Sequence, residues 1–177
     1  MKPANQLVKF INKSFFAPLA IIFLVQSFAF AGGNNGRWPV GPELDQTPGV
    51  ICTTPTAKRY AEQIDYCDRD VSSGLKNSII AKYDQKYGYS ILSMPRGDFK
   101  IDHFIPLSIG GANAEGNLWP QHKSVYGITD PIELELSVLI SAGEIKQADA
   151  IRAIKEVKMD LSKADSVMAY LKSLERH

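Results

Sequence analysis

The residues best suited to chemistry lie close together between positions 101 and 122. Two of the three histidines, His103 and His122, fall in this stretch, with the carboxylate Asp102 beside the first and the amide Asn117 between them. A neutral imidazole accepts protons near pH 7, and carboxylate oxygens are the ligands that Mg²⁺ prefers. The spacing therefore predicts a small site in which a proton acceptor, a metal ligand and an orienting amide meet.

Each of these residues has a predicted role. His103 is the candidate general base, and Asp102 is the candidate metal ligand. Asn117 is expected to orient His103 by a hydrogen bond, whereas Asn113 is interpreted as a turn residue. His122 is the candidate second metal ligand. Because adjacent residues of a strand point to opposite faces, Asp102 and His103 can share a site only if the strand twists or ends there.

Basic side chains around this stretch are candidates for contact with phosphate, although surface charges are more often only solvated. The three predicted contacts are Arg96, Lys100 and Lys123.

The elements that must position the site are a strand over 99–107, a Gly-rich loop over 108–116 and a helical C-terminal third. After Trp119-Pro120 the chain is predicted to be irregular as far as Thr129. Asp130 as N-cap, with Pro131 and Glu133 after it, predicts that a helix begins there and ends at Gly143. Further helices are expected over 146–158 and from Ser162. Upstream, a helix is expected over 56–64, and a second helix is expected to be capped by Ser72 or Ser73 and to end at Gly88. Residues 89–94 are expected to be extended.

The first 31 residues have the pattern of a secretory signal peptide. A basic region with three lysines precedes an apolar run from Phe15 to Val25, and a small-x-small pattern ends at Ala31. The run is too short to span a bilayer comfortably, so we expect cleavage near Ala31 and export to the periplasm or the medium, with no membrane contact by the mature chain. Residues 32–50 are predicted to be a flexible segment from which Trp38 docks on a domain over 51–177.

Cleavage at this point would change the formal charge from +1 to −2, because the leader carries three lysines and no acid. A strongly basic surface for coating nucleic acid is therefore not expected. The only two cysteines, Cys52 and Cys67, are predicted to form a disulfide, as an even pair in an exported chain usually does. A cysteine-bound zinc site is not expected, because it needs about four ligands.

The pattern Asp102-His103-x-Ile-Pro-Leu-x-x-Gly-Gly, followed by Asn117-Leu-Trp-Pro-Gln, resembles the HNH endonucleases of the ββα-metal class. It is most similar to an exported bacterial subgroup with a Leu-Trp-Pro motif. The resemblance covers roughly residues 50–157 and implies an α+β fold with a ββα core. It also implies that His103 is the general base, Asp102 a metal ligand and Asn117 the central asparagine.

The implied activity is metal-dependent hydrolysis of phosphodiester bonds with little sequence specificity, giving 5′-phosphate products. DNA is expected as the substrate ahead of RNA, and Mg²⁺ as the cofactor ahead of Mn²⁺ or Zn²⁺. The chain departs from the family at the helix-side ligand, where Tyr126 stands. His122, Asp130 and Glu133 are the alternatives for that ligand.

Two other functions fit the sequence. One is a catalytically degenerate HNH-like domain that binds nucleic acid or a protein partner. The other is a small exported interaction protein in which the motif serves only the core and the turns.

Overall fold

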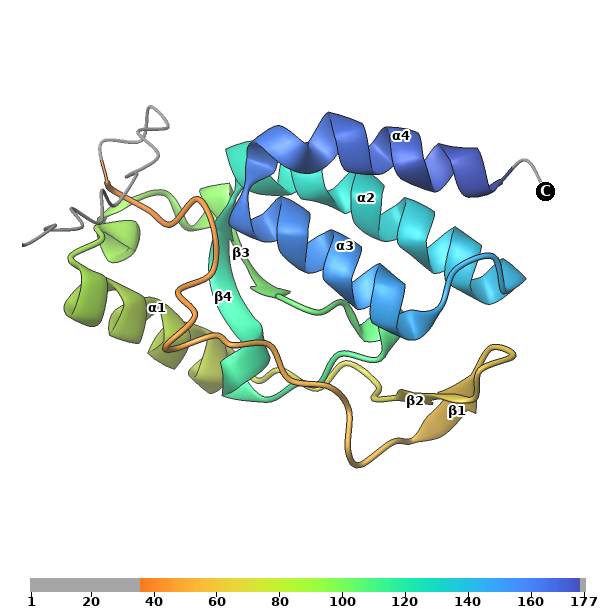
Figure 1. The fold of residues 1–177 in the computed structure, drawn as a ribbon. Helices are drawn as coiled ribbons and strands as arrows, with labels where there is room; N and C mark the ends of the chain where they lie inside the picture. Colours follow the sequence, from red (N-terminus) through yellow and green to blue (C-terminus); the bar gives the residue numbers. More distant parts are fainter. Residues whose placement is uncertain (1–35, 176–177) are drawn as a thin grey trace, which may run out of the picture. The chain divides into compact units, whose positions relative to one another are not determined.

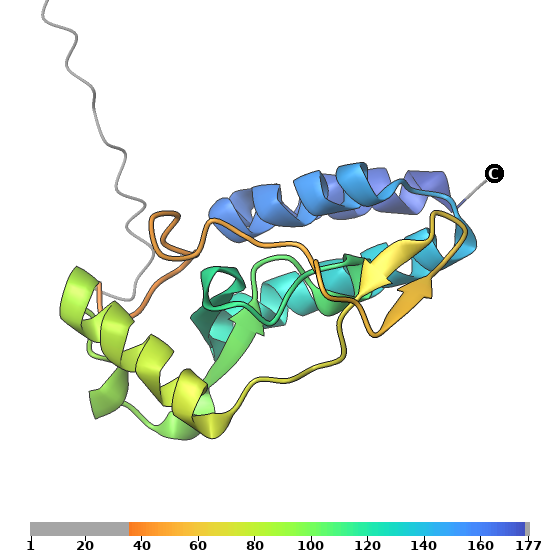
Figure 2. The ribbon, with the colours of Figure 1, turned by 90° about the horizontal axis from the view of Figure 1, so that it is seen from below.

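The computed structural model describes residues 36–175, which form an α+β fold of two small antiparallel sheets and four helices (Figures 1 and 2). The α+β class predicted from the sequence is thus confirmed, as is the helical C-terminal third. The strands are β1 (Ala57–Arg59), β2 (Ile64–Tyr66), β3 (Phe99–His103) and β4 (Leu118–His122), and the helices are α1 (Ser73–Tyr87), α2 (Lys123–Ala142), α3 (Gln147–Met159) and α4 (Ala164–Leu174).

The hairpin of β3 and β4 leads directly into α2. Its antiparallel register pairs Phe99 with His122 at one end and His103 with Leu118 at the other. The predicted strand from Phe99 is confirmed, but it ends at His103, which is where the site required an irregularity. The irregular segment predicted after Trp119 is wrong, because those residues form β4 and the first turns of α2.

Helix α2 begins seven residues earlier than Asp130, the predicted cap. The N-cap is His122, whose Nδ1 accepts a 3.2 Å hydrogen bond from the backbone nitrogen of Ser124. Pro131 consequently lies inside the helix. The carboxylates of Asp130 and Glu133 are therefore free to form ion pairs with lysines from other elements. The end of the helix at Gly143, in the left-handed conformation at φ 79°, agrees with the prediction.

Helix α1 has the predicted caps. The Ser72 hydroxyl accepts a 3.2 Å hydrogen bond from the backbone nitrogen of Leu75, and Gly88 ends the helix at φ 74°. The extended segment predicted after it is wrong, because short 3₁₀ turns cover 91–93 and 96–98. The carboxylate of Asp84 accepts hydrogen bonds from two successive backbone nitrogens of the first turn and so favours it over a strand.

The helix predicted over 56–64 is also wrong, because this segment is the β1–β2 hairpin. The Cys52–Cys67 disulfide forms as predicted and brings the two Cα atoms to 5.8 Å. The disulfide requires two residues 15 positions apart to lie close together. An antiparallel hairpin brings the ends of such a segment together, whereas a straight helix separates them. Tyr60 and Gln63 make the turn with positive φ values of 64° and 56°.

Two apolar cores flank the β3–β4 hairpin. One lies among α2, α3 and α4, which run side by side in Figure 1, and it includes Leu136, Ile154 and Leu171. The other joins α1 to the hairpin through Tyr83 and Trp119 among others. Burial of each large apolar side chain stabilises the fold by about 1.5–3 kcal/mol. The second core packs directly on the hairpin, since it includes Phe99, Ile101, Leu118 and Trp119.

The segment 36–50 has no helix or strand, but it is tied to the second core. The ring of Trp38 stacks on His122 with 4.2 Å between centroids, which confirms the predicted docking. Thr47 is buried, and its hydroxyl lies 2.7 Å from the Tyr83 hydroxyl. These contacts connect the segment 36–50 to the rest of the domain. The predicted signal peptide lies outside the described residues. No helix in the described part of the chain is both long and apolar enough to cross a membrane.

Candidate active site

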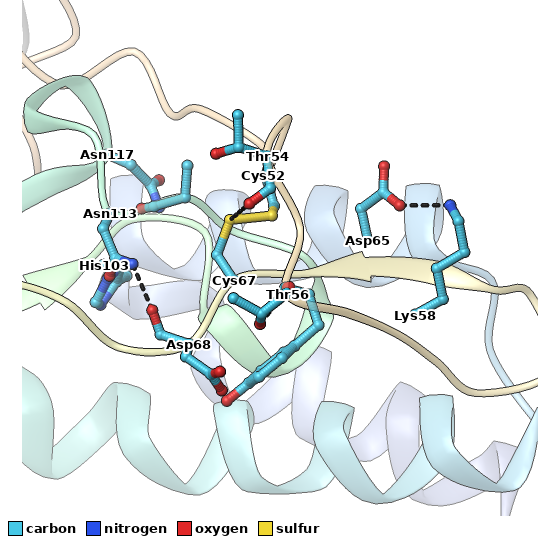
Figure 3. The surroundings of a disulfide bond; sticks show 12 residues. Cys52, Thr54, Thr56, Lys58, Asp65, Cys67, Asp68, His103, Asn113 and Asn117 are labelled. Atoms are coloured by element: carbon cyan, nitrogen blue, oxygen red, sulfur yellow. Dashed lines mark hydrogen bonds and ion pairs between the residues drawn. A yellow bond between two sulfur atoms is a disulfide. The ribbon is translucent and has the colours of Figure 1, made fainter.

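His103 lies at the last position of β3 and is 3% exposed. Its Nε2 is 3.1 Å from Oδ1 of Asn113, and Nδ2 of Asn113 donates a 2.6 Å hydrogen bond to the backbone oxygen of Asp68 (Figure 3). A backbone oxygen only accepts, so it fixes the amide with its nitrogen toward Asp68 and its oxygen toward the imidazole. Nε2 of a neutral His103 must then carry the proton, and Nδ1 is the nitrogen with the free lone pair.

The electrostatics of the site keep this imidazole neutral. Burial lowers the pKa of His103, the hydrogen bond to Asn113 opposes that shift, and the charge of Arg69 lowers the pKa further. Nδ1 has no hydrogen bond to any of the described residues, and it is not among their buried atoms that lack a partner. Nδ1 therefore keeps a lone pair that no described residue occupies.

Asn117 is fully buried and holds the loop between the two strands. Its Oδ1 accepts a 2.9 Å hydrogen bond from the backbone nitrogen of Ile105, and its Nδ2 donates to the backbone oxygens of Ile105 and Ala112, both at 2.9 Å. The hydrogen bond predicted between Asn117 and His103 is not formed, because the amide is fully used by the loop backbone. Asn113, interpreted as an ordinary turn residue, makes that contact instead.

The backbone of the loop requires glycine at positions 110 and 111. A Cβ on Gly111 would lie 1.8 Å from the backbone oxygen of Ile105, a distance that no side chain tolerates. Gly110 adopts φ 93°, in the region that glycine enters at little cost. The loop can therefore fold back onto the end of β3 and bring Asn113 to His103.

The side chain of Asp102 contacts a different element from that of His103, as expected for neighbours in a strand. Its Oδ2 accepts a 3.1 Å hydrogen bond from Nζ of Lys158 in α3, and Nζ of Lys100 lies 3.8 Å from its Oδ1. The Lys158 ammonium is fully buried and also donates to the backbone oxygen of His103 at 2.5 Å. Burial acts to raise the pKa of Asp102, but the two ammonium groups outweigh it and lower the pKa.

Two acids of α2 approach the same ammonium groups. Glu133 Oε1 lies 2.6 Å from Nζ of Lys158, and Asp130 Oδ1 lies 2.6 Å from Nζ of Lys100. Ligand atoms of Asp102, Asp130 and Glu133 all lie within 4.8 Å of one another. Burial raises the pKa of Glu133 to about 7, with Lys158 opposing the shift and Asp102 adding to it.

His122 is at the opposite end of the hairpin from His103. The two are separated by four positions along the ladder, or roughly 13 Å at the usual rise per residue. The His122 ring lies between Trp38 and Phe99, and its Nδ1 caps α2. The structure therefore does not bring together Asp102 and His122, the predicted pair of metal ligands.

Each predicted phosphate-binding residue already has a partner within the fold. Lys100 pairs with Asp130, Lys123 pairs with Asp98 at 2.7 Å, and Arg96 donates to the backbone oxygen of Phe99 at 2.5 Å. Arg96 and Lys123 also lie toward the end of the hairpin that is remote from His103.

Arg69 is the basic residue that sequence reasoning missed. Its side chain is exposed, and it donates to the backbone oxygen of Ile101 at 3.2 Å, two residues before His103. No acid pairs with it among the described residues, so its guanidinium retains donors for a ligand. The available signal was its position two residues after Cys67, since the predicted disulfide confines this segment.

Comparisons with protein-family models, curated proteins and solved structures find no match to this chain. The function must therefore be inferred from the chemistry of the site. That chemistry is a histidine held at a strand end with one nitrogen not hydrogen-bonded to any described residue, and the Arg69 guanidinium, which has no acid partner among residues 36–175.

Proposed function

We propose that this chain is an exported endonuclease of the HNH type that hydrolyses phosphodiester bonds of nucleic acid. The observation that carries the proposal is the fixed imidazole of His103, with Nε2 held through Asn113 and Nδ1 left to accept a proton. The order of strand, Gly-rich loop, strand and helix over β3, β4 and α2 supports the ββα core that the sequence motif implies. Asn117 supports it as well, since it ties the loop as a central asparagine would.

In this proposal, Nδ1 of His103 removes a proton from a water molecule, which attacks the phosphorus in line with the departing 3′ oxygen. The bond between phosphorus and the 3′ oxygen breaks, and this oxygen takes a proton from solvent water. The product carries the phosphate on its 5′ side. A positioned general base contributes about 10²–10⁴-fold to the rate. Arg69 binds the phosphate oxygens through the donors that Ile101 leaves free, because a guanidinium matches phosphate geometry.

A divalent ion, with Mg²⁺ ahead of Mn²⁺ or Zn²⁺, is the proposed cofactor. Among the described residues one group of three acids converges, namely Asp102, Asp130 and Glu133, and its oxygen ligands suit Mg²⁺. The ammonium groups of Lys158 and Lys100 already neutralise these carboxylates, and Asp102 and His103 contact different elements. The group thus fits the ion by ligand chemistry but not by its position relative to Nδ1, and we derive no step through a metal.

Export is part of the proposal. The Cys52–Cys67 disulfide is compatible with an oxidising compartment such as the periplasm or the medium. The proposed partner is nucleic acid, with DNA ahead of RNA. The mature charge of −2 predicts weak binding with little sequence specificity, and this binding should weaken further as salt rises.

The test is digestion of plasmid DNA and of RNA by the exported, oxidised chain, with Mg²⁺, with Mn²⁺ and with EDTA. His103→Ala should lower the rate of cleavage by at least about 10²-fold while the fold is retained. His122→Asn is the matched control, because asparagine is a good N-cap and the ring of His122 lies far from the proposed base. Cleavage by His103→Ala at the rate of the unchanged chain would refute the proposal. Loss of cleavage in His122→Asn alone would restore His122 as a metal ligand.

A catalytically degenerate HNH-like binding domain is the second candidate. It is favoured by one observation, the ion pairing of every member of the acidic group with a lysine. Salt-sensitive DNA binding without cleavage under any of these metals would support it.

A further inference from the structure

The Cys52–Cys67 disulfide lies beside His103 and is connected to it by a short chain of bonds (Figure 3). Cys67 is followed by Asp68, whose backbone oxygen accepts the 2.6 Å hydrogen bond from Asn113. Asn113 in turn holds Nε2 of His103 at 3.1 Å. One residue, Asp68, and the side chain of Asn113 with its two hydrogen bonds therefore connect the disulfide to the imidazole.

The other cysteine holds the same loop from its second side. The backbone nitrogen of Cys52 donates to the oxygen of Gly110 at 2.8 Å, and the backbone nitrogen of Ala112 donates to the oxygen of Val50 at 2.9 Å. An isolated β-bridge between Ile51 and Gly111 lies between these two hydrogen bonds. The segment that contains Cys52 thus fixes residues 110–112, which lead directly to Asn113.

The disulfide consequently joins the two segments that define the position of Asn113. Both cysteines are buried, at 3% and 8% exposure, whereas Asp68 and Arg69 are exposed and have few other anchors. Without the crosslink, residues 67–69 are held only by non-covalent contacts, and we expect the Asp68 oxygen to lose its fixed place. The Asn113 amide is then free to turn its nitrogen toward His103. A nitrogen donor at Nε2 requires the proton to sit on Nδ1, which removes the proton-accepting lone pair.

We propose that the Cys52–Cys67 disulfide is a positioning element of the active site, and that Nδ1 of His103 becomes the proton acceptor only in the oxidised chain. This inference rests on the proposed nuclease function. Reduction by a dithiol breaks the sulfur–sulfur bond and gives two thiols, while the dithiol loses two electrons and two protons and becomes a disulfide. In a reducing compartment the site would stay unformed, and it would assemble after export, when an oxidant reverses this exchange.

The test compares the oxidised chain with Cys52→Ser/Cys67→Ser by ¹⁵N NMR of the histidine side chains, which distinguishes protonated from unprotonated ring nitrogens. In the oxidised chain, Nε2 of His103 should carry the proton and Nδ1 should not. In the double variant, at a temperature where circular dichroism shows it folded, the two tautomers should mix and cleavage should fall by about 10-fold or more.

Asn113→Ala in the oxidised chain is the second variant, because it removes the connection and keeps the disulfide. It should cause the same change in tautomer, and it carries the test if the double variant does not fold. Lys58→Ala is the matched control, since it breaks only the exposed Lys58–Asp65 pair of the same closed loop. It should change neither the tautomer nor the cleavage rate.

A fixed Nε2–H tautomer in the folded double variant would overturn the inference, whatever its activity. If the double variant does not fold, a fixed tautomer in Asn113→Ala would overturn it. A shift of the tautomer in a chain that never cleaves nucleic acid would support the positioning and refute the nuclease proposal alone. The two failures are therefore distinguishable.

Discussion

Replacement of Lys158 by methionine should cause one of the largest losses of stability among single changes in this chain. The Lys158 side chain is 0% exposed, and its ammonium contacts Asp102, Glu133 and the backbone oxygen of His103 at 3.1, 2.6 and 2.5 Å. Methionine fills a similar volume but leaves two carboxylates facing each other, and the nearest remaining counter-charge is the Lys100 ammonium, 3.8 Å from Asp102 Oδ1. Removal of one partner from a buried ion pair costs about 3–5 kcal/mol, and we expect a loss in this range at pH 8.

The loss should depend on pH, because the two carboxylates titrate differently. In the folded chain the pKa of Glu133 is raised from its ordinary value of 4.5 to about 7. Between these two pH values the folded state therefore binds more protons than the unfolded chain. Stability from this group is present at low pH and is lost as pH rises through 7. Lys158 opposes the rise in the pKa of Glu133 and lowers the pKa of Asp102, so its removal raises both values. The variant should therefore regain part of its stability at pH 5.

Urea unfolding followed by circular dichroism at pH 5 and pH 8 measures both effects. Arg152→Met is the control in the same helix, because Arg152 is 73% exposed and forms only a surface pair with Asp149. It should cost less than about 1 kcal/mol at either pH. A loss below about 1 kcal/mol for Lys158→Met at pH 8, or an equal loss at both pH values, would refute this account of the ion-pair network.

Two further predictions concern the histidine and the loop. Burial lowers the pKa of His103 below its ordinary value of 6.5. The acid limb of the pH profile of cleavage should therefore lie at a lower pH than for a free imidazole. An acid limb centred above pH 6.5 would contradict the assignment of His103 as the base. Asn117→Ala should lower the free energy of unfolding by about 3 kcal/mol, as measured in urea. It leaves the backbone nitrogen of Ile105 and the backbone oxygens of Ile105 and Ala112 without partners. A loss under about 1 kcal/mol would show that the loop does not depend on this amide.

Local signals in the sequence were sufficient for several elements. Ser72 and Gly88 bracket α1 because a hydroxyl N-cap and a glycine C-cap act within one turn of the helix. The two cysteines form the predicted disulfide, and β3 begins at Phe99 as predicted. In each of these cases the determining contacts are made by residues near in sequence or, for the disulfide, by the only other cysteine of the sequence.

Elements determined by distant contacts were missed. The Asp130-Pro131-x-Glu133 pattern has the form of a helix start, yet His122 caps α2 and its ring packs between Trp38 and Phe99. Those aromatic neighbours come from residues far away in the sequence, or from the partner strand. No local rule distinguishes this histidine from an incidental loop residue.

The sequence motif and the three-dimensional site differ most at Asp102 and His103, whose side chains contact different elements. Alternation along β3 directs Asp102 to Lys158 of α3, which lies 56 positions away in the sequence and could not be paired with it from spacing. Lys158 also bonds the backbone oxygen of His103, so the same ammonium compensates the Asp102 charge and fixes the end of the strand from which the imidazole projects. Asp102 can therefore help to position the His103 imidazole without contacting it. In this arrangement its loss should alter the position of His103 through the backbone, even if no metal ion ever binds the carboxylate.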